Sequence, residues 1–317
     1  KADMNLCDKD GSSPFWIACC HGHKSTAQLL LDYGADMNLC YKDGISPLWI
    51  ACCNGHKSNA KLLLDKKADI TLCNKNGTSP LWIACCKGHE RTAKILLMNA
   101  ADMNLCNNNG TSPLWIACCH GHESTAKRLL DKKADMNLCN KDGNSPLWIA
   151  CCNGHENTAK LLLVNKADMN LCDKDGSSPF WIACCHGHKS TAQLLLDYGA
   201  DKNLCKKDGC TPLWIACSYG HTNLAKLLLV KKADMTLCHN NGSTPFWIAC
   251  CHGHESSAKL LLGNGADINV CDKDGNSPLW IACYNGHEST SQLLLVNAAD
   301  INICNKNGCT PLWAACC

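Results

Sequence analysis

Proline recurs every thirty-three residues along this chain, and this period constrains the fold more than any other feature. The chain has 10 prolines, and the spacing holds without an insertion from Pro14 to Pro311. A tryptophan follows each proline two residues later, from Trp16 to Trp313. One short unit has therefore been copied end to end. A unit this short cannot bury its own apolar face, so each copy must pack against the next, and the period predicts a solenoid.

Each unit is expected to begin at a hairpin tip and to continue into a short helix. In the representative unit 40–72, Asp43-Gly44 is a turn pair that tolerates positive φ and predicts a hairpin. Ser46 then places a hydroxyl directly before Pro47, where it can cap a helix that starts at the proline. These signals predict a first helix that begins at the proline of every unit.

The remainder of the unit predicts a second helix. Gly55 ends the first helix after about two turns, because glycine accepts the left-handed conformation of a C-terminal cap. Residues 57–64 then carry Ala60, Leu63 and Leu64 at the i, i+3, i+4 spacing of a one-sided apolar face. The unit is therefore expected to be a tip, a helix, a tight turn and a second helix.

The residues of one unit resemble those of the ankyrin repeat. The pattern of that family runs Asp-x-x-Gly-x-Thr-Pro-Leu, a paired Ala, Gly-His, a Leu-Leu pair and Gly-Ala-Asp-x-Asn. Its parts are matched by Asp8 and Gly11, Thr211-Pro212-Leu213, Gly220-His221, Leu228-Leu229 and residues 265–269. The resemblance implies an all-α ankyrin-repeat solenoid of helix-turn-helix units with β-hairpin tips. It also implies a single array over residues 1–317, with nine full units at 8–304 and partial units at 1–7 and 305–317.

The chain departs from this family pattern at three places. The second Ala of the pair is Cys, as at Cys19 and Cys52, a small apolar substitute that packs well. Tryptophan replaces the usual His after Pro-Leu, as at Trp49, so the hydrogen bond from that imidazole to the capping hydroxyl must be lost or replaced by the indole N–H. The glycine that ends the second helix is replaced in six copies, where a residue with a side chain in the left-handed conformation costs roughly 1 kcal/mol. These replacements are Lys67, Ala100, Lys133, Lys166, Lys232 and Ala298.

The chain contains 30 cysteines, and two interpretations of them remain open. Stacked helices lie about 8–10 Å apart, whereas a disulfide needs Cα atoms about 4.4–6.8 Å apart, so bridges between units are disfavoured. Reduced thiols that act as small apolar residues are typical of an intracellular protein. Disulfides are the alternative at two tips, which are flanked by Cys205 with Cys210 and by Cys304 with Cys309.

Metal-binding and catalytic sites are not expected. The string from Cys118 to His122 is rich in ligand types, but zinc needs four convergent ligands, and adjacent residues on a helix diverge by about 100°. The resemblance implies that the His of the Gly-His turn is structural. A nucleophilic cysteine needs a base and a pocket, yet the same Cys and His recur in nearly every copy. We expect no cofactor and no enzymatic activity.

Charge and hydropathy narrow the class of partner. The formal net charge is +2 and no run of Lys or Arg exceeds two residues, so nucleic acid is not an expected partner. The longest apolar run, as in Pro47 to Cys53, is far shorter than the roughly 20 residues that cross a bilayer. We expect a cytoplasmic protein, or an extracellular one if the sequons at Asn76, Asn109 or Asn241 carry glycan.

The family resemblance also implies where a partner would bind. In ankyrin-repeat proteins the hairpin tips and the first helices line a concave groove that binds other proteins. The matching tip positions are Ser12, Ile45, Thr78, Thr111 and Asn144. The matching positions at the ends of the first helices are Cys20, His21, Cys53, Asn54, Cys86, Lys87, Cys119, His120, Cys152, Asn153, Cys185, His186, Tyr219, Cys251, His252 and Tyr284.

Two functions of different class remain open at this point. The first is a non-enzymatic protein-protein interaction scaffold that presents a repetitive concave groove. The second is a self-assembling structural element that forms a fibre or tube by end-to-end or lateral stacking of uncapped arrays. Residues 1–36 and 166–201 are identical, so the groove suits a repetitive partner or other copies of the chain.

Overall fold

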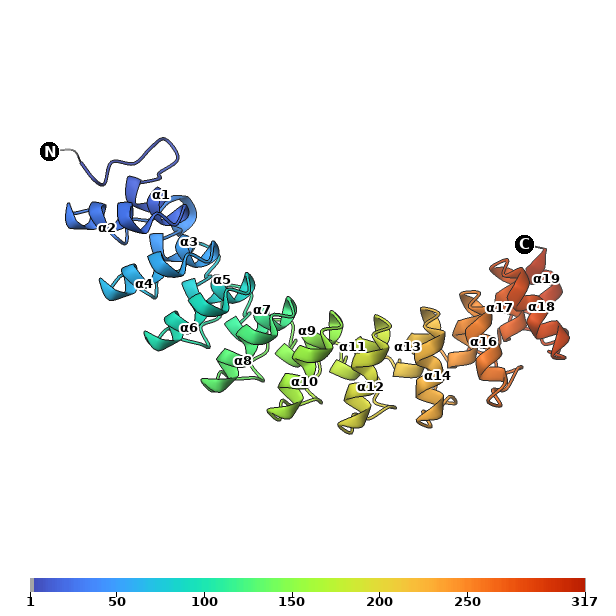
Figure 1. Ribbon diagram of the computed structural model, residues 1–317. Coiled ribbons are helices and arrows are strands. Elements are labelled where there is room, and N and C mark those ends of the chain that lie inside the picture. The colour runs from blue at the N-terminus through green and yellow to red at the C-terminus, as the bar shows by residue number, and fades with distance from the viewer. Residues whose placement is uncertain (1–2, 317) are drawn as a thin grey trace. The chain divides into compact units, whose positions relative to one another are not determined.

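A computed structural model describes residues 3–316 of the chain, and the regular structure in this range is helical. Short helices follow one another in pairs (Figure 1). The first helices of the pairs are α1 (Pro14–Cys20), α3 (Pro47–Cys53), α5 (Pro80–Cys86), α7 (Pro113–Cys119), α9 (Pro146–Cys152), α11 (Pro179–Cys185), α13 (Pro212–Ser218), α15 (Pro245–Cys251), α17 (Pro278–Tyr284) and α19 (Pro311–Ala315). The second helices are α2 (Lys24–Asp32), α4 (Lys57–Asp65), α6 (Glu90–Met98), α8 (Glu123–Asp131), α10 (Glu156–Val164), α12 (Lys189–Asp197), α14 (Thr222–Val230), α16 (Glu255–Leu262) and α18 (Glu288–Val296).

The pairs group into two compact units. One contains the residues up to Ala150 together with Asn157–Asp168, and the other contains Cys151–Glu156 together with the residues from Met169 onward. In the first of these, α3 packs against α1 and α5, and α4 packs against α2 and α6. In the second, α13 packs against α11 and α15 in the same way. Each helix pair thus gains its core from its neighbours, as the period predicts.

The first helices begin where the sequence predicts. Ser46 has an extended backbone, its Oγ accepts a hydrogen bond from the backbone N of Trp49 at 3.1 Å, and Pro47 occupies the first helical turn. The apolar face that follows is closed to solvent, since Leu48 is 1% exposed and Cys52 is 0% exposed. The capping hydroxyl and the proline therefore fix both the start of the helix and the side that it buries.

The tips are tight turns without β-strands anywhere in residues 3–316, where β-hairpins were expected. At one tip the backbone N of Asn74 donates to Thr78 O at 3.1 Å, and Gly77 N donates to Asn74 O at 2.8 Å. The Asn74 side-chain oxygen accepts two further backbone N–H groups, from Asn76 and Thr78, both at 3.0 Å. These local bonds close the turn before a strand ladder can form, and an isolated bridge between Tyr41 and Ile45 remains.

The joints after the second helices adopt the left-handed conformation that the sequence predicts. Gly34, Gly199 and Gly265 have φ values between 90° and 94°. The replacements share this conformation, with φ of 64° at Lys67 and 60° at Ala100. The fold therefore tolerates side chains in a region that favours glycine, at a cost of roughly 1 kcal/mol for each joint.

None of the helices within residues 3–316 has the length and the apolar content needed to span a membrane.

Candidate functional site

The tryptophan after each proline connects two successive units. Trp49 Nε1 donates to Thr78 O at 3.0 Å and also approaches its hydroxyl at 3.2 Å, and Trp82 makes the same pair of bonds with Thr111. The indole therefore replaces the missing imidazole, but its partner is the tip of the next unit rather than the capping hydroxyl. The same bond to a tip carbonyl joins Trp16 to Ile45, Trp115 to Asn144, Trp181 to Cys210, Trp214 to Ser243 and Trp247 to Asn276.

The histidine of the Gly-His turn makes a second connection. His56 Nε2 lies 2.9 Å from the carbonyl oxygen of Cys20 in the preceding unit, so this nitrogen carries the hydrogen that it donates. The ring covers Gly22, where a Cβ atom would lie 2.6 Å from His56 Nδ1. Glycine is therefore required there for space as well as for its φ of 74°. The same bond joins His89 to Cys53, His122 to Cys86, His188 to Cys152, His221 to Cys185, His254 to Ser218 and His287 to Cys251.

Polar segments between the helix pairs add two further connections. Asn38 Oδ1 accepts a hydrogen bond from the backbone N of Asp69 at 3.0 Å, one unit later in the chain. Tips also bond to tips, since Lys75 N donates to Asp43 O at 2.7 Å. Together with the indole and imidazole bonds, these contacts hold the tips and the first helices in a fixed register within each compact unit.

The residues that directly follow the first helices are exposed and form a row within each compact unit. They were predicted to line the groove, and at each copy they occupy the same place in the unit. The row consists of His21, Asn54, Lys87, His120, Asn153, His186, Tyr219 and His252. Tyr219 is 58% exposed and Tyr284, which ends its helix, is 55% exposed, so aromatic surface is available at two copies.

A row of half-buried cysteines lies one residue before this exposed row. Burial raises the pKa of the Cys53 and Cys86 thiols, so both are neutral at pH 7. The row consists of Cys20, Cys53, Cys86, Cys119, Cys152, Cys185 and Cys251. Burial likewise raises the pKa of the Cys185 and Cys251 thiols, so these four cysteines offer small apolar surface and no reactive thiolate.

The tip residues predicted for the groove contribute less surface than expected. Ser12 is 8% exposed, and Thr78 and Thr111 are each 6% exposed. The two threonine hydroxyls approach the indole nitrogens of the preceding units. Ile45 and Asn144 are half-buried. The two threonine side chains therefore face the joint between repeats, and the more accessible surface belongs to the ends of the first helices.

The two candidate disulfides are not formed. Cys205, Cys210, Cys304 and Cys309 are free thiols. The turn register explains the first pair, since Lys206 N donates to Cys210 O, so Lys206 rather than Cys205 lies opposite Cys210. Cys210 is 3% exposed whereas Cys205 faces solvent. The second pair has the same register: Asn305 N donates to Cys309 O, so Asn305 rather than Cys304 lies opposite Cys309.

The Cys-Cys-His-Gly-His string divides between the core and the surface. Cys118 is 0% exposed, as expected for a helix residue that faces the core, and His120 is exposed. His122 bonds to Cys86 O in the preceding unit. Across residues 3–316, no three His, Cys, Asp or Glu side chains are grouped in a way that could hold a metal ion.

The sequence interpretation missed the role of the ring side chains as connectors. The histidine after each glycine was interpreted as a turn residue, but its ring also bonds to the preceding unit. Its recurrence in every copy was the available signal, since a solvent-exposed turn residue has no reason to recur. Tyr41, which stacks on Trp16 with ring centroids 4.7 Å apart, carried no such signal because it occurs in a single copy.

Comparison with known proteins identifies the family. The model for ankyrin repeats (3 copies) matches residues 1–72, 68–139, 125–205, 198–272 and 246–317, which together extend along the whole chain. The chain belongs to the ankyrin-repeat family. A search among curated proteins finds no match.

Among solved structures, the ankyrin-repeat chain is similar to the crystal structure of the human ASB11 ankyrin repeat domain. The two share 25% sequence identity with a TM-score of 0.65. The match covers 70% of this chain and 99% of the ASB11 chain. Ankyrin repeats are protein-protein interaction modules, so the family indicates that this chain is a scaffold for protein partners.

Proposed function

We propose that this ankyrin-repeat chain presents a repetitive concave groove, lined by the ends of its first helices, to a protein partner that is itself repetitive. The observation that carries the proposal is an exposed row within each compact unit, from His21 to His120 in the first and from Asn153 to His252 in the second. Within each compact unit, bonds between successive repeats hold the row in register. A fixed row of this kind loses little conformational entropy when a partner binds. Its members are mainly polar, with one tyrosine at Tyr219, which suits a partner with both polar and aromatic contacts.

The identical segments make the repetitive part of the proposal testable. His21 and His186 occupy the same place in two stretches of identical sequence, 1–36 and 166–201. A photo-crosslinking residue at either site should capture the same partner from native material. The control is the same crosslinker at Lys127, which is exposed on α8 and away from the first-helix ends. Capture that is equally strong from Lys127, or different partners from the two histidine sites, would contradict the proposal.

Self-assembly is the second candidate function, because near-identical units offer the same surface many times. Under this alternative the partner is another copy of the chain, and the repeated contact does not close on itself. Sedimentation velocity over a wide range of concentrations tests it. Association that grows with concentration, and that is lost when Tyr219 and Tyr284 are both replaced by Ser, supports assembly. Self-assembly is contradicted if the sedimentation coefficient remains that of the monomer at every concentration.

A further inference from the structure

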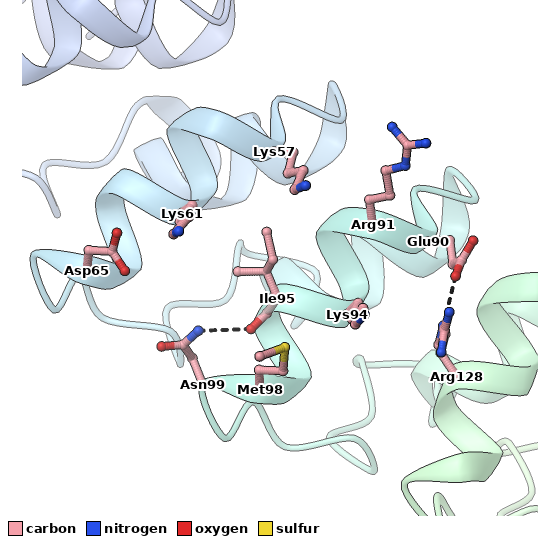
Figure 2. Close-up of a pocket in the computed structure, with 10 residues that line it drawn as sticks. All are labelled: Lys57, Lys61, Asp65, Glu90, Arg91, Lys94, Ile95, Met98, Asn99 and Arg128. Atoms are coloured by element: carbon pink, nitrogen blue, oxygen red, sulfur yellow. Dashed lines mark hydrogen bonds and ion pairs between the residues drawn. The ribbon is translucent and has the colours of Figure 1, made fainter.

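The repetition of the chain is broken most clearly on the face formed by the second helices. The chain has two arginines, Arg91 on α6 and Arg128 on α8. Both line one hollow of about 610 Å³, whose wall extends over α4, α6 and α8 (Figure 2). The hollow lies within the first compact unit.

Comparison between copies shows that the unusual residues gather at this hollow. The position of Arg91 holds Ser or Asn in the other full copies, and that of Arg128 holds Leu or Ile. The position of Met98 holds Asp, Val or Gly elsewhere. Because the other copies stack without these residues, stacking does not require them, and a second role has to explain why they lie together.

The hollow carries a surplus of positive charge. Five basic side chains line it, from Lys57, Lys61, Arg91, Lys94 and Arg128, against the two carboxylates of Asp65 and Glu90. One carboxylate is already paired, since Arg128 Nε lies 2.8 Å from Glu90 Oε1 (Figure 2). The surplus is three positive charges, on a chain whose formal net charge is +2. A surface of this kind attracts an anionic ligand.

Apolar surface lies beside these charges. The Met98 side chain is 69% exposed, and Ile95 is half-buried between α4 and α6 (Figure 2). Methionine is flexible and adapts to apolar partners. The basic surface also continues toward α2, because an adjoining hollow of about 450 Å³ shares Lys57 and Lys61 with the first and adds Lys24. The combined surface suits an extended chain rather than a compact small molecule.

We propose that the face formed by α2, α4 and α6, with Arg128 of α8, is a docking site for an acidic peptide segment that carries an apolar side chain. The carboxylates of the segment pair with Arg91, Lys94, Lys57 and Lys61, and its apolar side chain contacts Met98 and Ile95. Arginine suits this role because it binds carboxylates through two parallel N–H groups. The site goes beyond the proposed groove, since it belongs to the second helices and occurs once.

The chemistry of the hollow favours a peptide over a nucleic acid. Its described lining contains no aromatic side chain on which a base could stack. Asp65 and Glu90 would also oppose a phosphate backbone. A peptide can place its carboxylates and its apolar side chain at different points of the surface, so the two lining carboxylates do not oppose it in the same way.

The test uses the full chain and a fluorescein-labelled peptide of six glutamates around one leucine. Binding is measured by fluorescence anisotropy at low and at moderate salt. In the variant Arg91→Ser/Lys94→Gln, both new residues occur at the same positions of other copies, so the fold should be retained. We expect the dissociation constant to rise by about tenfold. The control Lys226→Gln/Lys259→Gln removes the same number of charges from α14 and α16 and should leave binding unchanged.

Two further measurements separate the contribution of the charges from that of the apolar contact. A peptide with glutamine in place of glutamate should bind much more weakly. The variant Met98→Asp introduces the residue found at the equivalent positions Asp65 and Asp131. It should weaken binding of the leucine peptide more than binding of a peptide in which serine replaces the leucine. Equal binding of the glutamine peptide would overturn the proposal. An equal loss in both double variants would overturn it as well, because it would show unspecific attraction. Tighter binding of an oligonucleotide of the same charge would assign the face to nucleic acid instead.

Discussion

At the scale of single residues, one glycine and one histidine of the next repeat act together at most turns between the two helices of a pair. Gly187 has a φ of 71°, and a Cβ atom there would lie 2.7 Å from the ring of His221 in the next unit. The ring in turn bonds to Cys185 O at 3.0 Å. The glycine thus fulfils two requirements at once, one of backbone conformation and one of space.

The two requirements can be separated within one helix pair. Gly199, in the same pair, has a φ of 93°, but a Cβ atom there would meet nothing within 4 Å. We predict that Gly199→Ala lowers the free energy of unfolding by about 1 kcal/mol, because of backbone strain alone. Gly187→Ala should lower it by about 2 kcal/mol or more, because the histidine ring must move and its hydrogen bond is lost. Urea unfolding measures both, and equal losses would show that the ring contact contributes nothing.

The lysines at the left-handed joints give a prediction of opposite sign. Lys133 has a φ of 65°, whereas the adjacent Lys132 has a φ of −93°. Lys133→Gly should raise the free energy of unfolding by about 0.5–1 kcal/mol, because strain is removed. Lys132→Gly should lower it by a similar amount, since only chain entropy changes. Stabilisation by both variants, or by neither, would contradict the assignment of strain to residue 133.

At the scale of the element, tryptophans connect first helices to the next tip, and Trp280 departs from this pattern. Trp247 Nε1 donates to Asn276 O at 2.8 Å. Trp280 Nε1 is buried without a hydrogen-bond partner among residues 3–316, and its ring stacks on Tyr284 with centroids 5.0 Å apart. The two tryptophans are otherwise equivalent in the unit, so they form a natural comparison.

Replacement of each tryptophan by phenylalanine should separate the hydrogen bond from the aromatic packing. We predict that Trp247→Phe destabilises the protein by about 1 kcal/mol more than Trp280→Phe does, because only the former removes a hydrogen bond. Asn276 O then keeps its bond from Asp272 N alone. Denaturant midpoints measured for the two variants give this difference. Equal destabilisation would mean that the indole bonds do not hold the units together.

The limits of sequence analysis are clearest for these connectors. The serine, proline and glycine signals predict the helix starts and stops because each acts within a few residues, as at Ser46 and Gly55. The partners of Trp49 and His56 lie 29 and 36 residues away, and no local rule specifies them. The tips became turns rather than hairpins, because the side chain of Asn74 takes the N–H groups that a strand ladder would use.

The candidate site also has features that local sequence signals predict and features that depend on contacts between distant residues. The register of the repeat predicts which residues end the first helices, so the exposed row was accessible to sequence reasoning. Burial of the tip residues could not be predicted from the sequence, because it depends on the indole of the preceding repeat, which lies against Thr78. The basic hollow between α4, α6 and α8 also needs the structure, since Arg91 and Arg128 belong to different copies.

At the scale of the whole molecule, the buried cysteines make stability sensitive to alkaline pH. Burial raises the pKa of the Cys19 and Cys217 thiols to about 12, above the value of about 8.5 in an unfolded chain. The folded state therefore keeps protons that the unfolded state loses. The stability that this contributes is fully present below about pH 8.5 and is lost as the pH rises from there through about pH 12.

We predict a fall in the free energy of unfolding of about 2 kcal/mol for each fully buried cysteine between pH 7 and about pH 10. Cys217→Ala should remove one such contribution and make the fall correspondingly smaller. The exposed Cys205→Ala is the control and should leave the pH dependence unchanged. A fall that is identical in the two variants would place its origin outside the core thiols.

The central claim is that each helix pair becomes stable only by packing against its neighbours. The most direct test is the unfolding of nested fragments taken from the first compact unit. The fragments end at residue 139 and begin at residue 74, 41 or 8, so they contain two, three or four repeats of 33 residues. The account predicts that the denaturant midpoint rises with every added unit. A two-unit fragment as stable as the four-unit fragment would contradict it.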